Sequence, residues 1–405
     1  MRVVIAPDTF KECLPAAEVA AAIGRGVLEV WGDAQVDLCP LADGGDGTVA
    51  AMVAATGGRL AAADVFDPLG RPRRAHFGIL GRAEPAVLPG ELGLAAGQAQ
   101  AGGAGGGVGG ERTVAIVEMS AASGLVLVPA DKRDPLRTTT YGTGQLIMAA
   151  INAGAGEIII GAGGSATVDG GCGAAQAMGV VFRDAAGREL ICGMGGGALL
   201  EVAEIDMAGR DRRVAGTRLR IACDVTNPLT GPSGAAAVYG PQKGATAEVV
   251  ERLERGLRHL AECIRRYLGI DVESLPGAGA AGGLAAGLVA FAGASLERGF
   301  AIISQAVGLG RRLAGADLCI TGEGRLDGQS RSGKTCYGVA EAARAAGVPV
   351  ICIPGSAADD APRELFTAVC PLVAGDVTVK SAMHHALKLL TQRAAEAVRQ
   401  FIRTE

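Results

Sequence analysis

The alternation of short apolar runs with helical patterns at both ends of the chain constrains its fold most. Near the N-terminus, apolar runs at 2–6 and 36–41 flank a segment whose apolar residues recur every three or four positions. The last third of the chain repeats this pattern, with apolar runs at 317–321, 348–353 and 368–373. Strands that alternate with helices are typical of a doubly wound, mainly parallel sheet.

The middle of the chain has a different pattern. Short apolar runs at 62–66, 75–79 and 114–118 follow one another without a helical segment between them, which predicts antiparallel strands. Helices are expected at 142–153 and 246–268, and the spacing from Val379 to Ile402 predicts one long terminal helix.

We therefore predict an α/β protein of two domains. Residues 1–60 and 295–405 would form one discontinuous Rossmann-like domain with a doubly wound, mainly parallel sheet. Residues 61–294 would form an inserted α/β domain with some antiparallel strands. We expect the active site in the cleft between the two domains, because such clefts are common ligand sites.

Glycine is abundant, at 64 of 405 residues, and occurs in separate motifs without a collagen-like period. One stretch, 95–110, consists almost only of Gly, Ala and Gln. Such a stretch cannot bury enough apolar surface to offset the entropy of ordering it. It is therefore predicted to be a disordered surface loop.

The charge balance excludes several classes of partner. Lys and Arg total 38 and Asp and Glu total 42, giving a net charge of −4, and aromatic residues are only 3%. No nucleic-acid or membrane partner is therefore expected. The uncharged stretch 276–296 is mostly Gly and Ala and too weakly apolar for a membrane span. The ten cysteines lack a C-x-x-C spacing, which indicates free thiols in a reducing, cytoplasmic location rather than a zinc site.

The polar residues that could do chemistry gather in loops that follow predicted strands, where open α/β sheets bind ligands. The loops combine exposed Gly backbone, isolated Asp residues and single cations, and phosphoryl transfer needs little more than these and Mg²⁺. None of the four His residues lies in them, which disfavours His-based catalysis. The loops are 8–11, 42–48, 161–171, 223–228, 240–244, 276–283 and 321–327.

Each loop also has a structural interpretation. A Gly-rich turn after a strand is often only a tight connection, and Asp43 could simply cap the helix that follows. Asp224 could belong to an ordinary turn, and Lys11 could be solvated. The match to G-x-x-x-x-G-K-[ST] at 328–335 is interpreted as a coincidence, because the preceding strand is expected to end near Thr321. The functional interpretation is favoured because so many such loops combine.

Taken together, these loops resemble the bacterial glycerate kinase family over nearly the whole chain. Four residues depart from the family pattern, Val168, Tyr239, Thr335 and Cys336, and the stretch 95–110 enlarges a loop that is short in the family. The matching stretches are APDTFK (6–11), ADGGDGT (42–48), EMSAASGL (118–125), KRDPLRTTTYGTGQLI (132–147), GAGGSATVDGG (161–171), CDVTNPLTG (223–231), YGPQKGA (239–245), PGAGAAGG (276–283) and TGEGRLDGQS (321–330).

The resemblance implies a two-domain α/β fold and ATP-dependent, Mg²⁺-assisted phosphorylation of D-glycerate to 2-phosphoglycerate. Formation of 3-phosphoglycerate by the same kinase remains open, and so does a homodimeric assembly. Two other classes also use Gly-rich loops: a Rossmann-type nucleotide-dependent oxidoreductase and a non-catalytic sensor of small acids. Against the first, no G-x-G-x-x-G follows the first strand; against the second, the loops carry more Asp and Lys than recognition needs.

Within the loops, we assign candidate roles by residue type. Arg325 is assigned to the glycerate carboxylate or a phosphate, with an ion pair to its neighbours as the alternative. The candidate catalytic residues are Lys11, Asp169, Asp224 and Lys243. The candidate substrate- or phosphate-binding residues are Asp8, Ser165, Gly163, Gly164, Gly279, Glu323, Arg325 and Asp327. The candidate magnesium ligands are Asp43 and Asp224.

Overall fold

The computed structural model describes residues 1–42, 44–45, 47–81, 87–88, 112–328, 330 and 335–404. Its described residues divide into two units. Unit 1 comprises Met1–Pro40, Ala83–Thr113 and Gly308–Glu405, and unit 2 comprises Leu41–Arg82 and Val114–Val307. Residues 41–60 and 295–307, which the sequence analysis assigned to the terminal domain, thus fall in unit 2. The Gly/Ala-rich stretch 95–110 lies outside the described residues.

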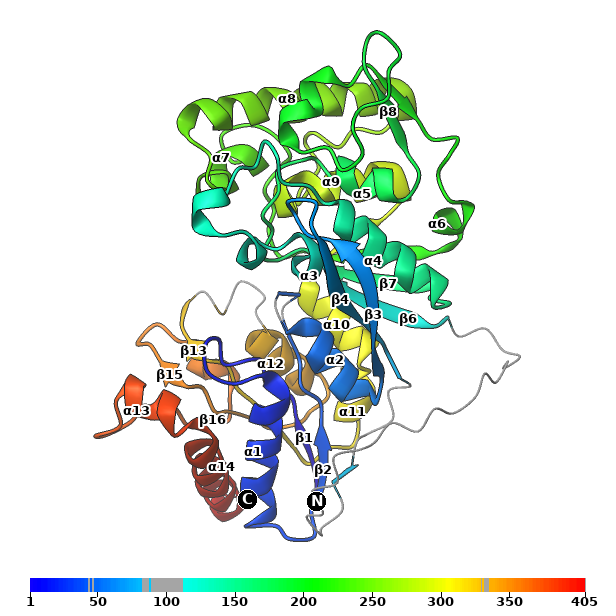
Figure 1. The fold of residues 1–405 in the computed structure, drawn as a ribbon. Helices are drawn as coiled ribbons and strands as arrows, with labels where there is room; N and C mark the ends of the chain where they lie inside the picture. The colour runs from blue at the N-terminus through cyan, green and yellow to red at the C-terminus, as the bar shows by residue number, and fades with distance from the viewer. Residues whose placement is uncertain are drawn as a thin grey trace. The chain divides into compact units, whose positions relative to one another are not determined.

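Unit 1 is built on a six-stranded sheet (Figure 1). All neighbouring strands run parallel except the last pair, β2 and β5. The strands, in spatial order, are β16 Ala368–Val369, β14 Val350–Cys352, β12 Leu318–Thr321, β1 Arg2–Ile5, β2 Gln35–Leu38 and β5 Val87–Leu88. A separate parallel pair joins β13 Arg325–Leu326 to β15 Ser356–Ala357. The predicted mainly parallel, doubly wound sheet is confirmed.

Helices cover both faces of this sheet. Val3 and Ile5 of β1 share one core cluster with residues of α1 and α14, whereas α12 packs on β12 and β14 from the other face, where Cys336 contacts Thr321. The helices are α1 Ala16–Leu28, α11 Leu309–Leu313, α12 Thr335–Ala345, α13 Val379–His384 and α14 Ala386–Thr404. Because both faces are covered, the strands read as continuous apolar runs.

The terminal helix predicted as one element is two. α13 ends at His384, and His385 has φ −112° and ψ 22°, outside helical geometry, before α14 begins. α14 packs closely on α1, and a Cβ at Gly26 would lie 2.2 Å from the carbonyl oxygen of Thr391. Glycine at position 26 therefore permits the close approach of these two helices.

Unit 2 is built on a second six-stranded sheet, parallel from β11 to β6 and antiparallel from β6 to β3. The antiparallel portion expected in the middle of the chain is confirmed. The strands, in spatial order, are β11 Ser295–Glu297, β10 Arg218–Ala222, β7 Glu157–Gly161, β6 Val114–Glu118, β4 Pro72–Ile79 and β3 Arg59–Phe66. A small antiparallel pair joins β8 Val181–Arg183 to β9 Glu204–Asp206.

Two core clusters organise the helices of unit 2. One lies between the sheet and α4 and α9, and the other lies beneath α8, where Leu253, Leu257 and Leu260 are fully buried. In Figure 1, α2 and α10 lie on the side of this sheet opposite to α4 and α9. The helices are α2 Thr48–Thr56, α3 Ser120–Ser123, α4 Tyr141–Asn152, α5 Cys172–Ala177, α6 Arg212–Gly216, α7 Ala235–Tyr239, α8 Ala247–Leu268, α9 Leu284–Ala292 and α10 Gly299–Ala306.

Candidate active site

The loops of unit 2 that carry candidate residues meet at one edge of its sheet. The register pairs Glu118 of β6 with Gly161 of β7, and Gly161 with Ala222 of β10, so these three strands end side by side. A Cβ at Gly161 would lie 2.4 Å from the carbonyl oxygen of Gly44. The chain at Gly44 therefore crosses the end of β7, next to the loop that follows this strand.

Lys243 is buried among these loops. It ends a short 3₁₀ helix, Pro241–Lys243, and is only 1% exposed. Its Nζ donates hydrogen bonds to the hydroxyl of Ser165 at 2.7 Å and to the carbonyl oxygen of Thr167 at 2.8 Å. Burial lowers the pKa of Lys243 to about 7, while the nearby Asp169 carboxyl opposes that shift. The sequence placed Lys243 and Ser165 in different loops, and the structure brings them into contact.

Ser165 is almost buried, with 8% of its area exposed. The backbone around it is fixed, because Leu125 N donates to Gly164 O at 2.8 Å and Ala166 N donates to Ser123 O at 2.9 Å. A charged Lys243 can only donate to the Ser165 oxygen. The hydroxyl proton of Ser165 can then be donated to an oxygen of a ligand.

Asp169 is fully buried and accepts four hydrogen bonds. Its Oδ2 accepts from the backbone N and the hydroxyl of Thr140, both at 2.7 Å, and from Gly173 N at 3.3 Å, and its Oδ1 accepts from Gly171 N at 3.1 Å. Burial raises the pKa of this carboxyl, and the hydrogen bonds oppose the rise. The carboxyl joins the start of α4 to the start of α5. Thr140 is a hydrogen-bond partner of Asp169 that the candidate set lacked, although the run Thr138–Thr140 was visible in the sequence.

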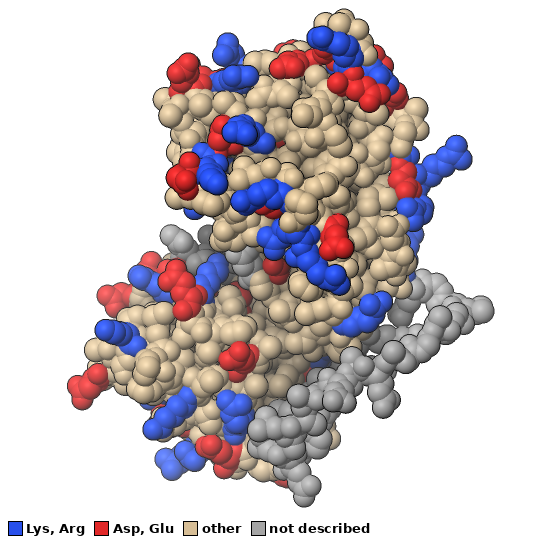
Figure 2. Space-filling model, in the orientation of Figure 1, with Lys and Arg blue, Asp and Glu red and all other residues tan. Residues whose placement is uncertain are grey.

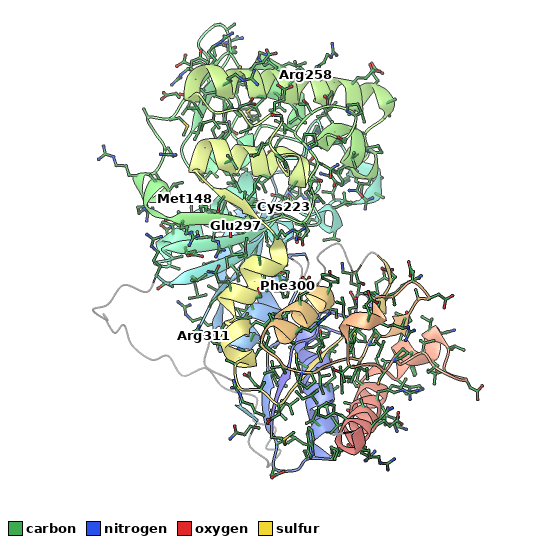
Figure 3. The ribbon with its side chains drawn as sticks, turned by 180° about the vertical axis from the view of Figure 1, so that it is seen from behind. Met148, Cys223, Arg258, Glu297, Phe300 and Arg311 are labelled. Atoms are coloured by element: carbon green, nitrogen blue, oxygen red, sulfur yellow. The ribbon has the colours of Figure 1, made fainter. Side chains whose placement is uncertain are left out.

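Asp224 is exposed just beyond β10. Its Oδ1 accepts from Gly299 N at 2.9 Å, so the carboxyl lies at the first residue of α10. Figure 3 labels Cys223 and Glu297 where β10 and β11 end side by side, and Cys223 N donates to Glu297 O at 2.9 Å. The segment is thus held at the same sheet edge as Ser165.

Two of the three candidate glycines of unit 2 lie where another loop's backbone approaches closely. A Cβ at Gly163 would lie 3.1 Å from Gly45 Cα, and one at Gly279 would lie 2.3 Å from the carbonyl oxygen of Pro228. Gly164 has φ +71°, which favours glycine. Glycine is therefore favoured at positions 163 and 279 because one loop packs closely against another. At position 164 it is favoured because the backbone φ is positive.

The candidates of unit 1 gather at the point where its strand order reverses. β1 and β12 are adjacent and parallel, and their following loops diverge toward opposite edges of the sheet, which is the usual ligand position in such sheets. Asp8 and Glu323 lie in these two loops and are each 6% exposed. Asp8 N donates to Gly322 O at 2.8 Å, and a Cβ at Gly324 would lie 3.6 Å from Lys11 N.

The remaining side chains of that loop are held locally. Glu323 Oε1 accepts from the hydroxyl of Ser330 at 2.8 Å. Arg325 begins β13, its side chain is 71% exposed, and its Nε lies 3.5 Å from Asp327 Oδ2. This contact is the ion pair that the sequence analysis gave as the alternative to ligand binding by Arg325. Because the pair is exposed, the guanidinium is still accessible to a ligand. Lys11 is exposed.

Asp43, the second expected magnesium ligand, lies outside the described residues, and so does Lys334 of the P-loop-like stretch. In the part of the chain that the structure describes, no three His, Cys, Asp or Glu residues are grouped as a metal site would require. β12 ends at Thr321, as the sequence analysis predicted. The strand therefore ends several residues before Gly328, the first residue of the P-loop-like stretch.

Comparison with known proteins decides the family. The sequence model of the glycerate kinase family matches residues 3–402. The chain belongs to the glycerate kinase family. It is 45% identical to the glycerate kinase of Bacillus subtilis over 399 residues, which cover 98% of this chain and 96% of the relative. It is 47% identical to the glycerate 2-kinase of Escherichia coli over 360 residues, which cover 89% and 86%.

A solved structure agrees. The crystal structure of a glycerate kinase 2 from Salmonella typhimurium aligns with 100% of this chain at 44% identity, with a TM-score of 0.85. The chain is therefore a kinase with the α/β fold that the resemblance implied, and kinase membership implies ATP use. The oxidoreductase and sensor alternatives are wrong. None of the described helices is long and apolar enough to cross a membrane.

Proposed function

We propose that this kinase transfers the γ-phosphoryl group of ATP to the 2-hydroxyl of D-glycerate, with Mg²⁺, giving 2-phosphoglycerate and ADP. The hydroxyl oxygen forms a bond to the γ-phosphorus, the bond from that phosphorus to the leaving oxygen of ADP breaks, and the hydroxyl proton is released. The contact of buried Lys243 with Ser165, at the convergence of three loops, carries the mechanistic part of this proposal.

The Lys243–Ser165 contact suits an anionic reactant. Because Lys243 is buried, its charge is poorly screened by water and acts over a short distance on any phosphate or carboxylate near Ser165. Phosphoryl transfer depends mainly on positioning and on such fixed charge. Ser165 would donate its hydroxyl proton to the reactant, and Lys243 would orient Ser165 from behind.

The unit 1 loops carry a second group of charged residues. Asp8 and Glu323 are almost buried at the carboxyl ends of adjacent strands, and Arg325 is exposed nearby in sequence. We assign Arg325 and Lys11 to the negative charge of the reactants, with Asp8 and Asp327 as partners that orient these loops. A homodimer and a cytoplasmic location stay predictions.

Mg²⁺ fits the donor set described. This ion usually takes one or two carboxylates together with phosphate oxygens and water, rather than a cage built only of protein ligands. Asp224 offers an exposed carboxylate, and its Oδ1 accepts a hydrogen bond from Gly299 N. Asp224, with Asp43 as the expected second ligand, would hold the ion. When bound, Mg²⁺ would neutralise charge on the transferred phosphoryl group.

Similarity to a named relative supports the 2-hydroxyl of glycerate as the phosphoryl acceptor. The Escherichia coli relative is named glycerate 2-kinase and is 47% identical to this chain. Transfer to the 3-hydroxyl is the alternative, because a glycerate bound by its carboxylate could present either hydroxyl to the phosphoryl donor.

Coupled assay of ADP release tests the reaction class. Full-length protein with ATP, Mg²⁺ and D-glycerate should release ADP, whereas omission of glycerate, or its replacement by L-glycerate, should reduce release to background. Circular dichroism and a thermal melt of the same sample establish that it is folded. Folded protein without D-glycerate-dependent ADP release would overturn the proposal.

A further inference from the structure

Unit 2 also has a pocket whose lining residues are not among the candidate site residues. A pocket of about 480 Å³ is lined by Leu69, Asp131, Lys132, Arg133, Asp134 and Arg137. Five of these six residues are charged, and three are cations. The volume lies in the range typical of small-molecule sites. Figure 2, which shows one face of the molecule, has positive and negative side chains interspersed, as the small net charge leads one to expect.

One wall of this pocket is rigid because its turn is held by a carboxyl. Asp67 Oδ1 accepts from Leu69 N and from Arg71 N, both at 2.9 Å, and its Oδ2 accepts from Arg71 Nε at 2.6 Å. Thr139 N donates to Pro68 O at 3.1 Å, which fixes the β3–β4 turn against the segment that carries the cations.

The turn that carries Asp134 and Arg137 is also held by hydrogen bonds. Asp134 Oδ1 accepts from Leu136 N at 3.0 Å, and Asp134 O accepts from Arg137 N at 3.0 Å. Gly197 N donates to Leu136 O at 2.9 Å, so the turn is also held from another part of the chain. A preorganised backbone reduces the entropy that binding would otherwise cost.

The three cations of the pocket form no salt bridge within the described residues, although Asp131 and Asp134 line the same pocket. Within the described ranges, no ion pair engages Lys132, Arg133 or Arg137. The Nε of Arg133 is buried from solvent and has no hydrogen-bond acceptor among the described residues. A buried donor without a partner carries a desolvation cost that a bound anion would remove.

The pocket also borders the Lys243 loop. A Cβ at Gly244 would lie 2.3 Å from the carbonyl oxygen of Arg133, and the hydroxyl of Thr138 donates to Ala166 O at 2.8 Å. The segment that carries the cations therefore contacts Gly244, which follows Lys243, at one end. At its other end it contacts Ala166, which follows Ser165.

We propose that this pocket binds phosphate groups of a reactant in the kinase reaction, through Arg133, Arg137 and Lys132. The inference rests on the proposed function and adds a phosphate subsite to it. Arginine suits this ligand because its planar fork can bind two phosphate oxygens at once. The phosphates could be those of ATP or that of the phosphoglycerate product, and the experiment separates these sources.

The test compares Arg137→Gln and Arg133→Gln with a control, Arg255→Gln. Arg255 is exposed on α8 and does not line the pocket. Calorimetry on the full chain measures the binding of a non-hydrolysable ATP analogue and, separately, of 2-phosphoglycerate. At least one of these ligands should bind about tenfold or more weakly to each pocket variant, which is the loss expected for one charge-assisted hydrogen bond. Arg137→Lys should restore part of the affinity because the charge remains.

The pattern of losses identifies the source of the phosphate. If only the ATP analogue loses affinity, the pocket binds nucleotide phosphates. If only 2-phosphoglycerate loses affinity, the pocket binds the transferred phosphate. If both ligands lose affinity, the pocket is a position that they share. Unchanged binding of both ligands to folded variants would overturn the inference. Equal loss for unphosphorylated D-glycerate would also overturn it, because the pocket would then hold a carboxylate. An inactive wild type that still binds the ATP analogue through these arginines would contradict only the proposed reaction.

Discussion

Burial gives Lys243 a charge that depends on pH near neutrality. Its pKa is lowered to about 7 in the folded chain because water is excluded around it. In the unfolded chain a lysine has a pKa of about 10.4. Between these two values the unfolded chain binds a proton that the folded chain does not, so proton binding favours unfolding as the pH falls.

Comparison of the wild type with Lys243→Met should reveal this linkage. The unfolding free energy of the wild type should rise relative to that of the variant as the pH increases from about 7 to about 10, by up to about 1.4 kcal/mol per pH unit. Below pH 7 the difference should level off, because both states of the wild type are then protonated. Urea unfolding of both proteins across this range measures it. A difference that is constant between pH 7 and 10 would show that Lys243 keeps its ordinary pKa.

Asp224 accepts a hydrogen bond from Gly299 N and is also proposed to bind Mg²⁺. One substitution distinguishes these two roles. Asn retains an oxygen that can accept from Gly299 N, so Asp224→Asn should leave the thermal midpoint nearly unchanged. Because the negative charge is lost, we expect kcat to fall at least about a hundredfold at saturating Mg²⁺. Steady-state kinetics with a parallel melt would check this. A kcat close to that of the wild type would remove Asp224 from the metal and catalytic assignments.

At the scale of elements, Asp169 joins α4 to α5. Its four acceptor bonds come from Thr140, Gly171 and Gly173, which lie at the starts of these helices. A Cβ at Gly173 would lie 2.1 Å from the hydroxyl oxygen of Thr139, so the two helix starts are packed without spare room. Asp169 is thus in a position to order the loop that carries Ser165.

Asp169→Ala should therefore destabilise the fold. It leaves several buried donors without an acceptor, and we expect the unfolding free energy to fall by about 3–5 kcal/mol. Asp64→Ala is a suitable control, because that side chain is 87% exposed and should change stability by less than about 0.5 kcal/mol. Urea denaturation compares the two. If Asp169→Ala costs no more than the control, the carboxyl does not hold these helices together.

Elements with strong periodicity could be predicted from the sequence, and side-chain contacts between loops could not. The helix expected at 246–268 appears as Ala247–Leu268, with Thr246 accepting from Val249 N at its start. The contact of Lys243 with Ser165 depends on tertiary packing of two loops, so no local pattern could reveal it. The break at His385 was missed because the apolar spacing continues across it.

At the scale of the whole molecule, two sheets of different topology each bring loops to the ends of parallel strands. Unit 1 does so where its strand order reverses, and unit 2 does so where β6, β7 and β10 end together. Strand–helix alternation predicted the first arrangement. The long matching stretches, rather than any single loop, predicted the kinase family, which the match over residues 3–402 confirms.

The central claim is that phosphate is transferred to the 2-hydroxyl of D-glycerate, and proton-coupled ³¹P NMR of the reaction mixture tests it directly. The phosphorus of 2-phosphoglycerate couples to the single proton on C2, whereas that of 3-phosphoglycerate couples to the two protons on C3. Incubation of the full-length protein with ATP, Mg²⁺ and D-glycerate should therefore produce a new phosphate resonance split into a doublet. A triplet would contradict the assigned hydroxyl, and the absence of any phosphoglycerate resonance would contradict the reaction itself.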